Sequence, residues 1–226
     1  MNQVFMAWSG GKDGCLALHR AITKGLKVRN LSNMVTEDGE RSRTHGLSAR
    51  VLQEQSQAIG IPLVQRRASW QSYEGEFKRM VNDLKQEGIK GGVFGDIDFQ
   101  EHRDWVERVC REVDITPYLP LWGEEQDKIL KDFINLGFKA IVVATKADIL
   151  GEGWLGKEIN LDFIDQLSEI KKTRDITLCG EAGEYHTLVV DGPLFGKRLE
   201  ITASRKTFRD EHWLLEILST ELKGKQ

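Results

Sequence analysis

Apolar and polar positions follow two different periods along the first half of the chain. Short apolar runs have the length of buried strands, and each precedes a segment in which apolar residues recur every three or four positions, as on one helix face. Such a face runs through Leu47, Leu52 and Ile59, and Gly60 stands where that helix would end. The predicted strands are residues 3–8, 28–35, 62–68 and 91–97, and the predicted helices are residues 14–25, 45–61, 73–89 and 100–113.

Strands that alternate with helices of this length predict a parallel sheet with crossover helices, which is an α/β fold. The rhythm changes after residue 124, where a helical stretch, a strongly apolar strand at 139–147 and a strand-like segment at 198–210 follow one another. We therefore predict an N-terminal domain at residues 1–124 and a smaller C-terminal α+β subdomain at residues 125–226.

Composition narrows the class of protein. The 226 residues are 40% hydrophobic, which is enough for a sizeable core, and the net charge of -3 does not favour direct nucleic-acid binding. The three cysteines are far apart and odd in number, so neither a disulfide framework nor a cysteine-rich zinc site is expected. Neither a signal peptide nor an apolar run of the roughly 18 residues that a membrane span needs is evident, so we expect a cytoplasmic protein without membrane contact.

A glycine-rich loop, "SGGKDG" at residues 9–14, lies between the first predicted strand and the first predicted helix. Backbone N–H groups at the start of a helix attract phosphate, and glycine lets the backbone approach it closely. Lys12 can add positive charge and Asp13 can hold Mg²⁺. The spacing is neither that of a Walker A loop nor that of a dinucleotide fingerprint, and an ordinary turn with a helix cap remains the alternative.

Two further polar segments are candidates for the same site. Asp96 is at the end of a predicted strand, where it is suited to bind magnesium or a ribose, or alternatively to cap a helix. The segment "GEAGEYHT" at residues 180–187 carries Glu181 and Glu184, which suit a cationic substrate or ammonia, and His186, which can shuttle a proton. The alternative for this segment is a surface turn with solvated acids.

Two tryptophans next to glycines are candidates for binding a trimethylammonium group. Trp122 and Trp154 would attract such a cation through their ring faces, although core packing is the commoner use of tryptophan. His45 and His102 are candidates for touching nucleotide or for starting a helix. Cys15, directly after the loop, is expected to be a small buried helix residue rather than a nucleophile.

The loop resembles the SGGxDS pyrophosphate-binding loop of N-type ATP pyrophosphatases. Further segments resemble signature blocks of the diphthine–ammonia ligase family, in that family's order: "VFGDIDFQEHRDWVERVC", "PYLPLWG", "GWLGKEI" and "CGEAGEYHTLVVDGPLF". The resemblance extends over residues 3–205. It implies a Rossmann-like parallel sheet of the adenine nucleotide alpha hydrolase-like type, with a smaller C-terminal domain.

The resemblance also implies roles for individual residues. The catalytic residues would be Lys12, Asp13, Glu181 and Glu184, and the metal ligands Asp13 and Asp96. ATP would be bound by Ser9, Gly10, Gly11, Lys12, Asp13, Gly14, Met34, Gly95, Asp96 and Ile97. The substrate would be bound by Gly180, Glu181, Gly183, Glu184, Tyr185, His186 and Thr187, together with Trp122. Gly14 departs from the family, which places serine there.

The implied activity is an ATP-dependent amidation. The carboxylate of diphthine, a modified histidine on a translation elongation factor, would be adenylated and then attacked by ammonia, giving an amide, AMP and pyrophosphate. ATP, Mg²⁺, ammonia and the elongation factor are thus the expected cofactors and partners. The base rate of symmetric oligomers favours a homodimer. The alternatives are an AMP-forming enzyme that acts on another small carboxylate or carbonyl substrate, and a non-catalytic ATP-binding module.

Overall fold

The computed structural model describes residues 2–43 and 45–225 and divides into two compact units. The N-terminal unit comprises Met1–Ser9 and Asp13–Trp122. The C-terminal unit comprises Gly10–Lys12 and Gly123–Gln226. Three residues of the first loop therefore pack with the second half of the chain, while the residues on either side of them pack with the first half.

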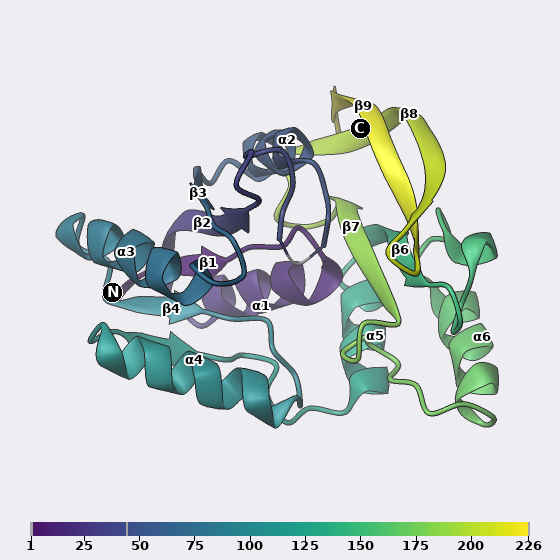
Figure 1. Ribbon diagram of the computed structural model, residues 1–226, viewed down its shortest axis with the longest axis horizontal. Helices are drawn as coiled ribbons and strands as arrows, with labels where there is room; N and C mark the ends of the chain where they lie inside the picture. The colour runs from purple at the N-terminus through teal and green to yellow at the C-terminus, as the bar shows by residue number, and fades with distance from the viewer. Residues whose placement is uncertain (1, 44, 226) are drawn as a thin grey trace. The chain divides into compact units, whose positions relative to one another are not determined.

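The N-terminal unit is built on a five-stranded parallel sheet with the strand order β3-β2-β1-β4-β5 (Figure 1). Its strands are β1 (Gln3–Ala7), β2 (Lys27–Val35), β3 (Leu63–Arg67), β4 (Gly91–Val93) and β5 (Thr116–Tyr118). Its helices are α1 (Lys12–Thr23), α2 (Ala49–Ile59), α3 (Tyr73–Gln86) and α4 (Gln100–Glu112). Each predicted strand and helix of residues 3–113 is present, and the predicted Rossmann-like fold class is confirmed.

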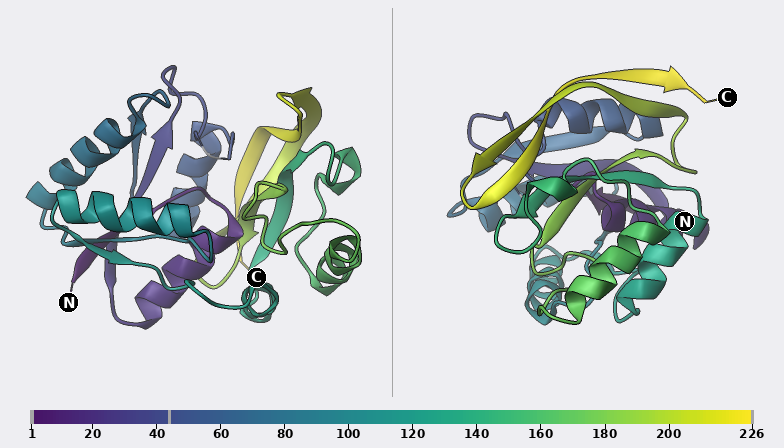
Figure 2. Two further views of the ribbon diagram at one scale, coloured as in Figure 1. Left: turned by 60° about the horizontal axis from the view of Figure 1, so that its bottom comes forward. Right: turned by 90° about the vertical axis from the view of Figure 1, so that its right-hand side faces the viewer.

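The helices cover both faces of this sheet, α3 and α4 on one and α1 and α2 on the other (Figure 2). On the α3–α4 face, Phe5 of β1 packs edge-on against Phe77 of α3 and Phe94, with ring centroids 6.1 and 6.0 Å apart. The indole nitrogen of Trp8 donates a hydrogen bond to Gln55 of α2 at 2.9 Å. Burial on both faces explains why the central strands β1 and β4 have few polar residues, whereas the outer strand β3 (LVQRR) is only partly buried.

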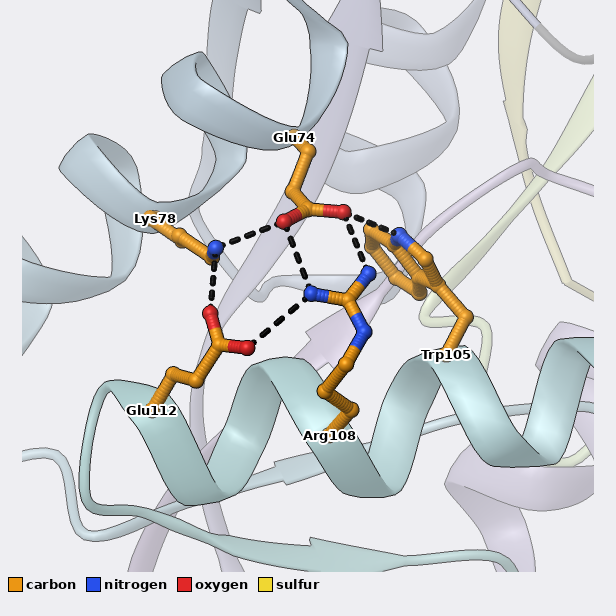
Figure 3. Close-up of polar contacts among 5 residues, drawn as sticks. All are labelled: Glu74, Lys78, Trp105, Arg108 and Glu112. Carbon is orange, nitrogen blue, oxygen red and sulfur yellow. Dashed lines mark hydrogen bonds and ion pairs between the residues drawn. The ribbon is translucent and has the colours of Figure 1, made fainter.

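Charged side chains join α3 to α4 at their outer surface (Figure 3). Glu74 accepts from Arg108 at 2.6 Å, from Lys78 at 2.6 Å and from the Trp105 indole at 2.9 Å. Glu112 bridges Lys78 and Arg108 from the other side. The hydrogen bonds from Arg108 and Lys78 hold the pKa of the Glu74 carboxyl well below its usual range. Because these side chains are partly exposed, the network orients the two helices more than it stabilises the fold.

The C-terminal unit contains a four-stranded antiparallel sheet with the strand order β7-β6-β9-β8. Its strands are β6 (Lys139–Lys146), β7 (Tyr185–Asp191), β8 (Lys197–Arg209) and β9 (His212–Gly224). Its helices are α5 (Gln126–Asn135), the short 3₁₀ helix η1 (Glu152–Trp154) and α6 (Leu161–Lys171). The predicted α+β character of this half of the chain is confirmed.

The last strand, β9, has no counterpart in the sequence-based prediction. It pairs along its whole length with β8 through a two-residue turn in which Asp210 and Glu211 have φ of 49° and 62°. Hairpin turns of this geometry are usually marked by Asn-Gly or Asp-Gly, and this one has no glycine. The turn was therefore not recognisable from its residue types.

Candidate functional site

The SGGKDG loop connects the end of β1 to the first turn of α1. The N–H of Trp8 still bonds to Ser32 of β2 at 2.7 Å, and α1 begins four residues later at Lys12. Gly10 has a φ of 80°, in the left-handed region where glycine avoids the penalty of a side chain. The chain therefore reverses at Gly10 and enters a helix of 12 residues, whose N-terminal N–H groups and dipole favour an anion.

Lys12 is buried, with 3% of its surface exposed. Its N–H donates to Thr187 Oγ1 at 3.0 Å, and its ammonium group donates to the carbonyl oxygen of Cys179. The ammonium also lies 5.0 Å from the centroid of the Tyr185 ring. The C-terminal unit thus brings the lysine of the first loop together with the GEAGEYHT segment, from which it is separated by more than 160 residues in the sequence.

The GDI segment, which comprises residues 95–97, lies against the first turn of α1 within the N-terminal unit. A Cβ added to Gly95 would lie 3.1 Å from both the carbonyl carbon of Asp13 and the nitrogen of Gly14. Asp96 Oδ1 is 3.3 Å from His102 Nδ1, and Ile97 is fully buried. The absence of a side chain at Gly95 therefore allows the loop after β4 to approach the SGGKDG loop closely.

The described residues contain no group of three or more His, Cys, Asp or Glu side chains that could hold a metal by themselves. This fits the way proteins bind Mg²⁺ to nucleotides, because such sites use one or two carboxylates and take the remaining ligands from phosphates and water. Asp13 is in the first turn of α1 and Asp96 follows the Gly95 contact with that turn. The donor set is thus suited to a magnesium ion that arrives with a triphosphate.

Gly14 is not required by the backbone. A Cβ at this position would meet Ser9 Oγ at 3.7 Å, Met6 Cε at 3.8 Å and Trp8 Cε3 at 4.0 Å, which are ordinary van der Waals distances. Its φ lies outside the left-handed region. A Cβ would therefore fit here without moving the neighbouring atoms.

The end of β2 supplies the position expected to be near adenine. The side chain of Met34 is buried in the core of the α3–α4 face, and its carbonyl oxygen accepts from the N–H of Arg43 at 2.9 Å. Asn33, which the sequence did not single out, donates to Trp8 O at 2.8 Å and Ser42 Oγ at 3.0 Å. This amide ties the start of the SGGKDG loop to the segment after β2, and only its burial within the fold gives it that role.

Glu184 is 1% exposed and accepts hydrogen bonds from three donors of its own loop. These are the N–H of Thr177, the hydroxyl of Thr177 at 3.0 Å and the N–H of Ala182 at 3.0 Å. Gly180 and Gly183 within this loop have φ of 77° and 82°. We refer to residues 177–184 as the clasp loop, because its two ends are joined through the Glu184 carboxylate.

Glu181 and His186 differ in their surroundings. Glu181 is partly exposed, and its N–H donates to Thr177 Oγ1 at 2.8 Å. Burial, followed by the positive charges of Lys12 and His212, lowers the pKa of His186 to about 4. At neutral pH His186 is therefore an uncharged imidazole, which can accept a proton but holds it weakly.

Each tryptophan expected to bind a trimethylammonium group already faces a cation of the chain itself. The Arg103 guanidinium lies 4.9 Å from the ring centroid of Trp122, and the Lys157 ammonium lies 4.2 Å from that of Trp154. Trp154 also packs edge-on against Phe163. Cys15 is fully buried, which raises the pKa of its thiol and agrees with the structural role expected for it.

A parallel α/β sheet whose first loop is glycine-rich and opens a helix defines the class of nucleotide-binding α/β proteins. Comparison with known families narrows this class. Residues 2–117 match the family model described as the diphthamide synthase N-terminal domain, and residues 125–222 match the diphthamide synthase C-terminal domain. The chain therefore belongs to the diphthamide synthase family, which confirms the resemblance found in its motifs.

Three similar proteins share the name diphthine–ammonia ligase. A protein of Schizosaccharomyces pombe named diphthine–ammonia ligase is 30% identical over 86% of this chain, although the match spans only 35% of that longer protein. Proteins of the same name from Rattus norvegicus and Homo sapiens are 28% and 27% identical over 96% and 87% of this chain, and the matches span 89% and 81% of those proteins.

The comparison with solved structures adds only a weak likeness. The crystal structure of a predicted subunit of tRNA methyltransferase from Methanocaldococcus jannaschii is 15% identical to this chain, with a TM-score of 0.46. The match spans 85% of this chain and 98% of that one. Separately, none of the helices in the described part of the chain is long and apolar enough to cross a membrane.

Proposed function

We propose that this protein is an ATP-dependent amide ligase of the diphthine–ammonia ligase type. The observation that carries the proposal is the SGGKDG loop, which leads from β1 into the first turn of α1 and includes a buried lysine and a carboxylate. Membership of the diphthamide synthase family over both of its domains supports the choice of substrate.

The proposed reaction has two steps. The carboxylate of diphthine attacks the α-phosphorus of ATP, and the bond to the bridging oxygen breaks, so that pyrophosphate leaves. Ammonia then attacks the acyl carbon of the adenylate, loses a proton and displaces AMP. The N–H groups at the start of α1 and the ammonium of Lys12 stabilise the charge that grows on the departing pyrophosphate.

We assign the magnesium ion to Asp13 and Asp96. When bound, the ion neutralises phosphate charge and aligns the leaving group. Two observations support this assignment: Asp13 is in the first turn of α1, and Asp96 follows Gly95, which approaches that turn closely. His186, neutral at physiological pH and close to Lys12, is expected to contact the substrate as an uncharged imidazole.

The partners follow from the same reaction. The elongation factor that carries diphthine supplies the carboxylate, and free ammonium or a second protein supplies ammonia. We place the protein in the cytoplasm with this substrate and expect it to act as a homodimer.

The test is to incubate the protein with ATP, Mg²⁺ and ammonium, with and without diphthine-bearing elongation factor, and to measure AMP and pyrophosphate. We expect AMP to form only with the elongation factor, and Asp13→Ala to reduce its rate roughly 100-fold or more. Asp162→Ala is the matched control, since Asp162 is also in the first turn of a helix. AMP formation with a small carboxylate alone would instead favour a different substrate, and ATP binding without AMP under any condition would favour a binding module.

A further inference from the structure

The Glu184 carboxylate is fully engaged inside its own loop. One oxygen accepts from the N–H of Thr177, and the other accepts from the Thr177 hydroxyl and the N–H of Ala182, both at 3.0 Å. The side chain is 1% exposed. A carboxylate whose two oxygens already accept three hydrogen bonds is poorly placed to take a proton from a substrate or to bind a cation. The geometry therefore disfavours the acid–base role that a glutamate at position 184 would suggest.

Further hydrogen bonds hold the backbone around Cys179, which lies inside the loop that Glu184 closes. Within the loop that Glu184 closes, Tyr185 Oη donates to the carbonyl of Leu178 at 2.7 Å, and the N–H of Cys179 donates to Gln126 Oε1 at 2.9 Å. A Cβ added to Gly180 would lie 2.7 Å from the carbonyl oxygen of Tyr185, so the backbone has no room to shift on that side. The neighbours of Cys179 on both sides, Leu178 and Gly180, are thereby held against Tyr185, which restricts the orientation of the Cys179 carbonyl.

That carbonyl is the acceptor for the Lys12 ammonium. The Tyr185 ring lies 5.0 Å from the same ammonium, and the N–H of Lys12 is held by Thr187 Oγ1. The carbonyl of Gly10 accepts from the N–H of Val189 at 3.0 Å. The bond to the Cys179 carbonyl uses one of the three N–H donors of the ammonium and fixes the position of the group.

We propose that Glu184 is a positioning residue, which closes the clasp loop so that the Cys179 carbonyl holds the Lys12 ammonium where the triphosphate of ATP binds. The inference rests on the proposed function for the identity of the ligand. It deepens that function by giving different roles to two acidic residues of one segment. Glu184 acts through Lys12, whereas the partly exposed Glu181 keeps the expected role of binding the substrate.

The test is a double-mutant cycle read out by ATP affinity. Titrate wild type, Glu184→Gln, Lys12→Met and the double variant with ATP and Mg²⁺ by calorimetry. We expect each single variant to weaken ATP binding by roughly 10-fold or more, because a hydrogen bond to a charged group is lost or misplaced. In the Lys12→Met background, Glu184→Gln should change the affinity less than about 2-fold. Glu169→Gln, an exposed glutamate of α6, should bind ATP as the wild type does.

Kinetics provide a second readout that a purely structural role would not move. With the elongation factor as substrate, Glu184→Gln should raise the KM for ATP while the pH–rate profile keeps both of its limbs. Loss of one limb of the profile would show that Glu184 acts as an acid or base and would overturn the inference. Multiplicative effects of the two substitutions on ATP affinity would overturn it as well.

A second variant and the behaviour of the wild-type protein distinguish the remaining outcomes. If Glu184→Gln does not fold, Thr177→Val removes one of its donors without removing the carboxylate, and the same coupling with Lys12→Met is expected at a smaller size. A wild-type protein that binds ATP but forms no AMP overturns the proposed function alone, since the cycle is measured on ATP binding. A wild-type protein that binds no ATP overturns both.

Discussion

The SGGKDG loop and the clasp loop both combine glycines with acidic residues, but they differ in what shapes them. The clasp loop satisfies much of its backbone internally, because Glu184 and Thr177 accept from N–H groups within seven residues of themselves. The SGGKDG loop is held from outside, by Thr187 and Val189 of β7. A glycine-rich acidic segment can thus serve either as a binding loop or as the rigid support for one.

We expect the clasp loop to tolerate substitution less well than the SGGKDG loop, and substitutions of its glycines should have the largest effect. Gly180→Ala places a side chain 2.7 Å from a backbone oxygen at a φ of 77° and should lower the free energy of unfolding by about 2–4 kcal/mol. Gly183→Ala is the matched control, with a φ of 82° but no atom within 4 Å of the new Cβ, and should cost about 1–2 kcal/mol. Urea unfolding measures both, and equal losses would contradict the tight packing against Tyr185.

The second prediction concerns pH and His186, which follows the clasp loop on β7. Its pKa is about 4 in the folded protein and near 6.5 when unfolded, so the unfolded chain binds more protons between these values. The stability that the neutral imidazole contributes is present above about pH 6.5 and is lost as the pH falls toward 4, by on the order of 2–3 kcal/mol.

Urea unfolding as a function of pH measures this contribution. His186→Gln should flatten the dependence of unfolding free energy on pH over the same interval. An unchanged slope in that variant would assign the acid sensitivity to other groups.

The smallest expected effect is in the SGGKDG loop, at Gly14. Gly14→Ser fits the available space, so the free energy of unfolding should change by no more than about 0.5 kcal/mol, in the stabilising direction. The added hydroxyl should tighten ATP binding by up to roughly 10-fold if it reaches a phosphate oxygen. Gly14→Ala adds the Cβ without the hydroxyl, so the difference between the two variants isolates the hydrogen bond. Equal ATP affinities for both would show that the hydroxyl makes no such bond.

The fold was largely predictable because its signals are local. The central strands β1 and β4 are buried and have few polar residues. The helix α2 ends at Gly60, whose φ of 81° and bond to Ser56 form the expected cap. The strand β9 escaped prediction because "HWLLEILSTELKG" is half-buried, mixes apolar and polar residues without strict alternation, and follows a turn without glycine.

By itself the sequence determined the α/β class, the glycine-rich loop at the start of α1 and the family, since each depends on residue types at short spacings. Only the tertiary structure decided what Glu184 and Lys12 do. Whether a carboxylate binds a substrate or closes a loop depends on which donors surround it, and the acceptor of Lys12 is a backbone carbonyl 167 residues away. Every residue has such a carbonyl, so no residue type in the sequence marks the one that a lysine will reach.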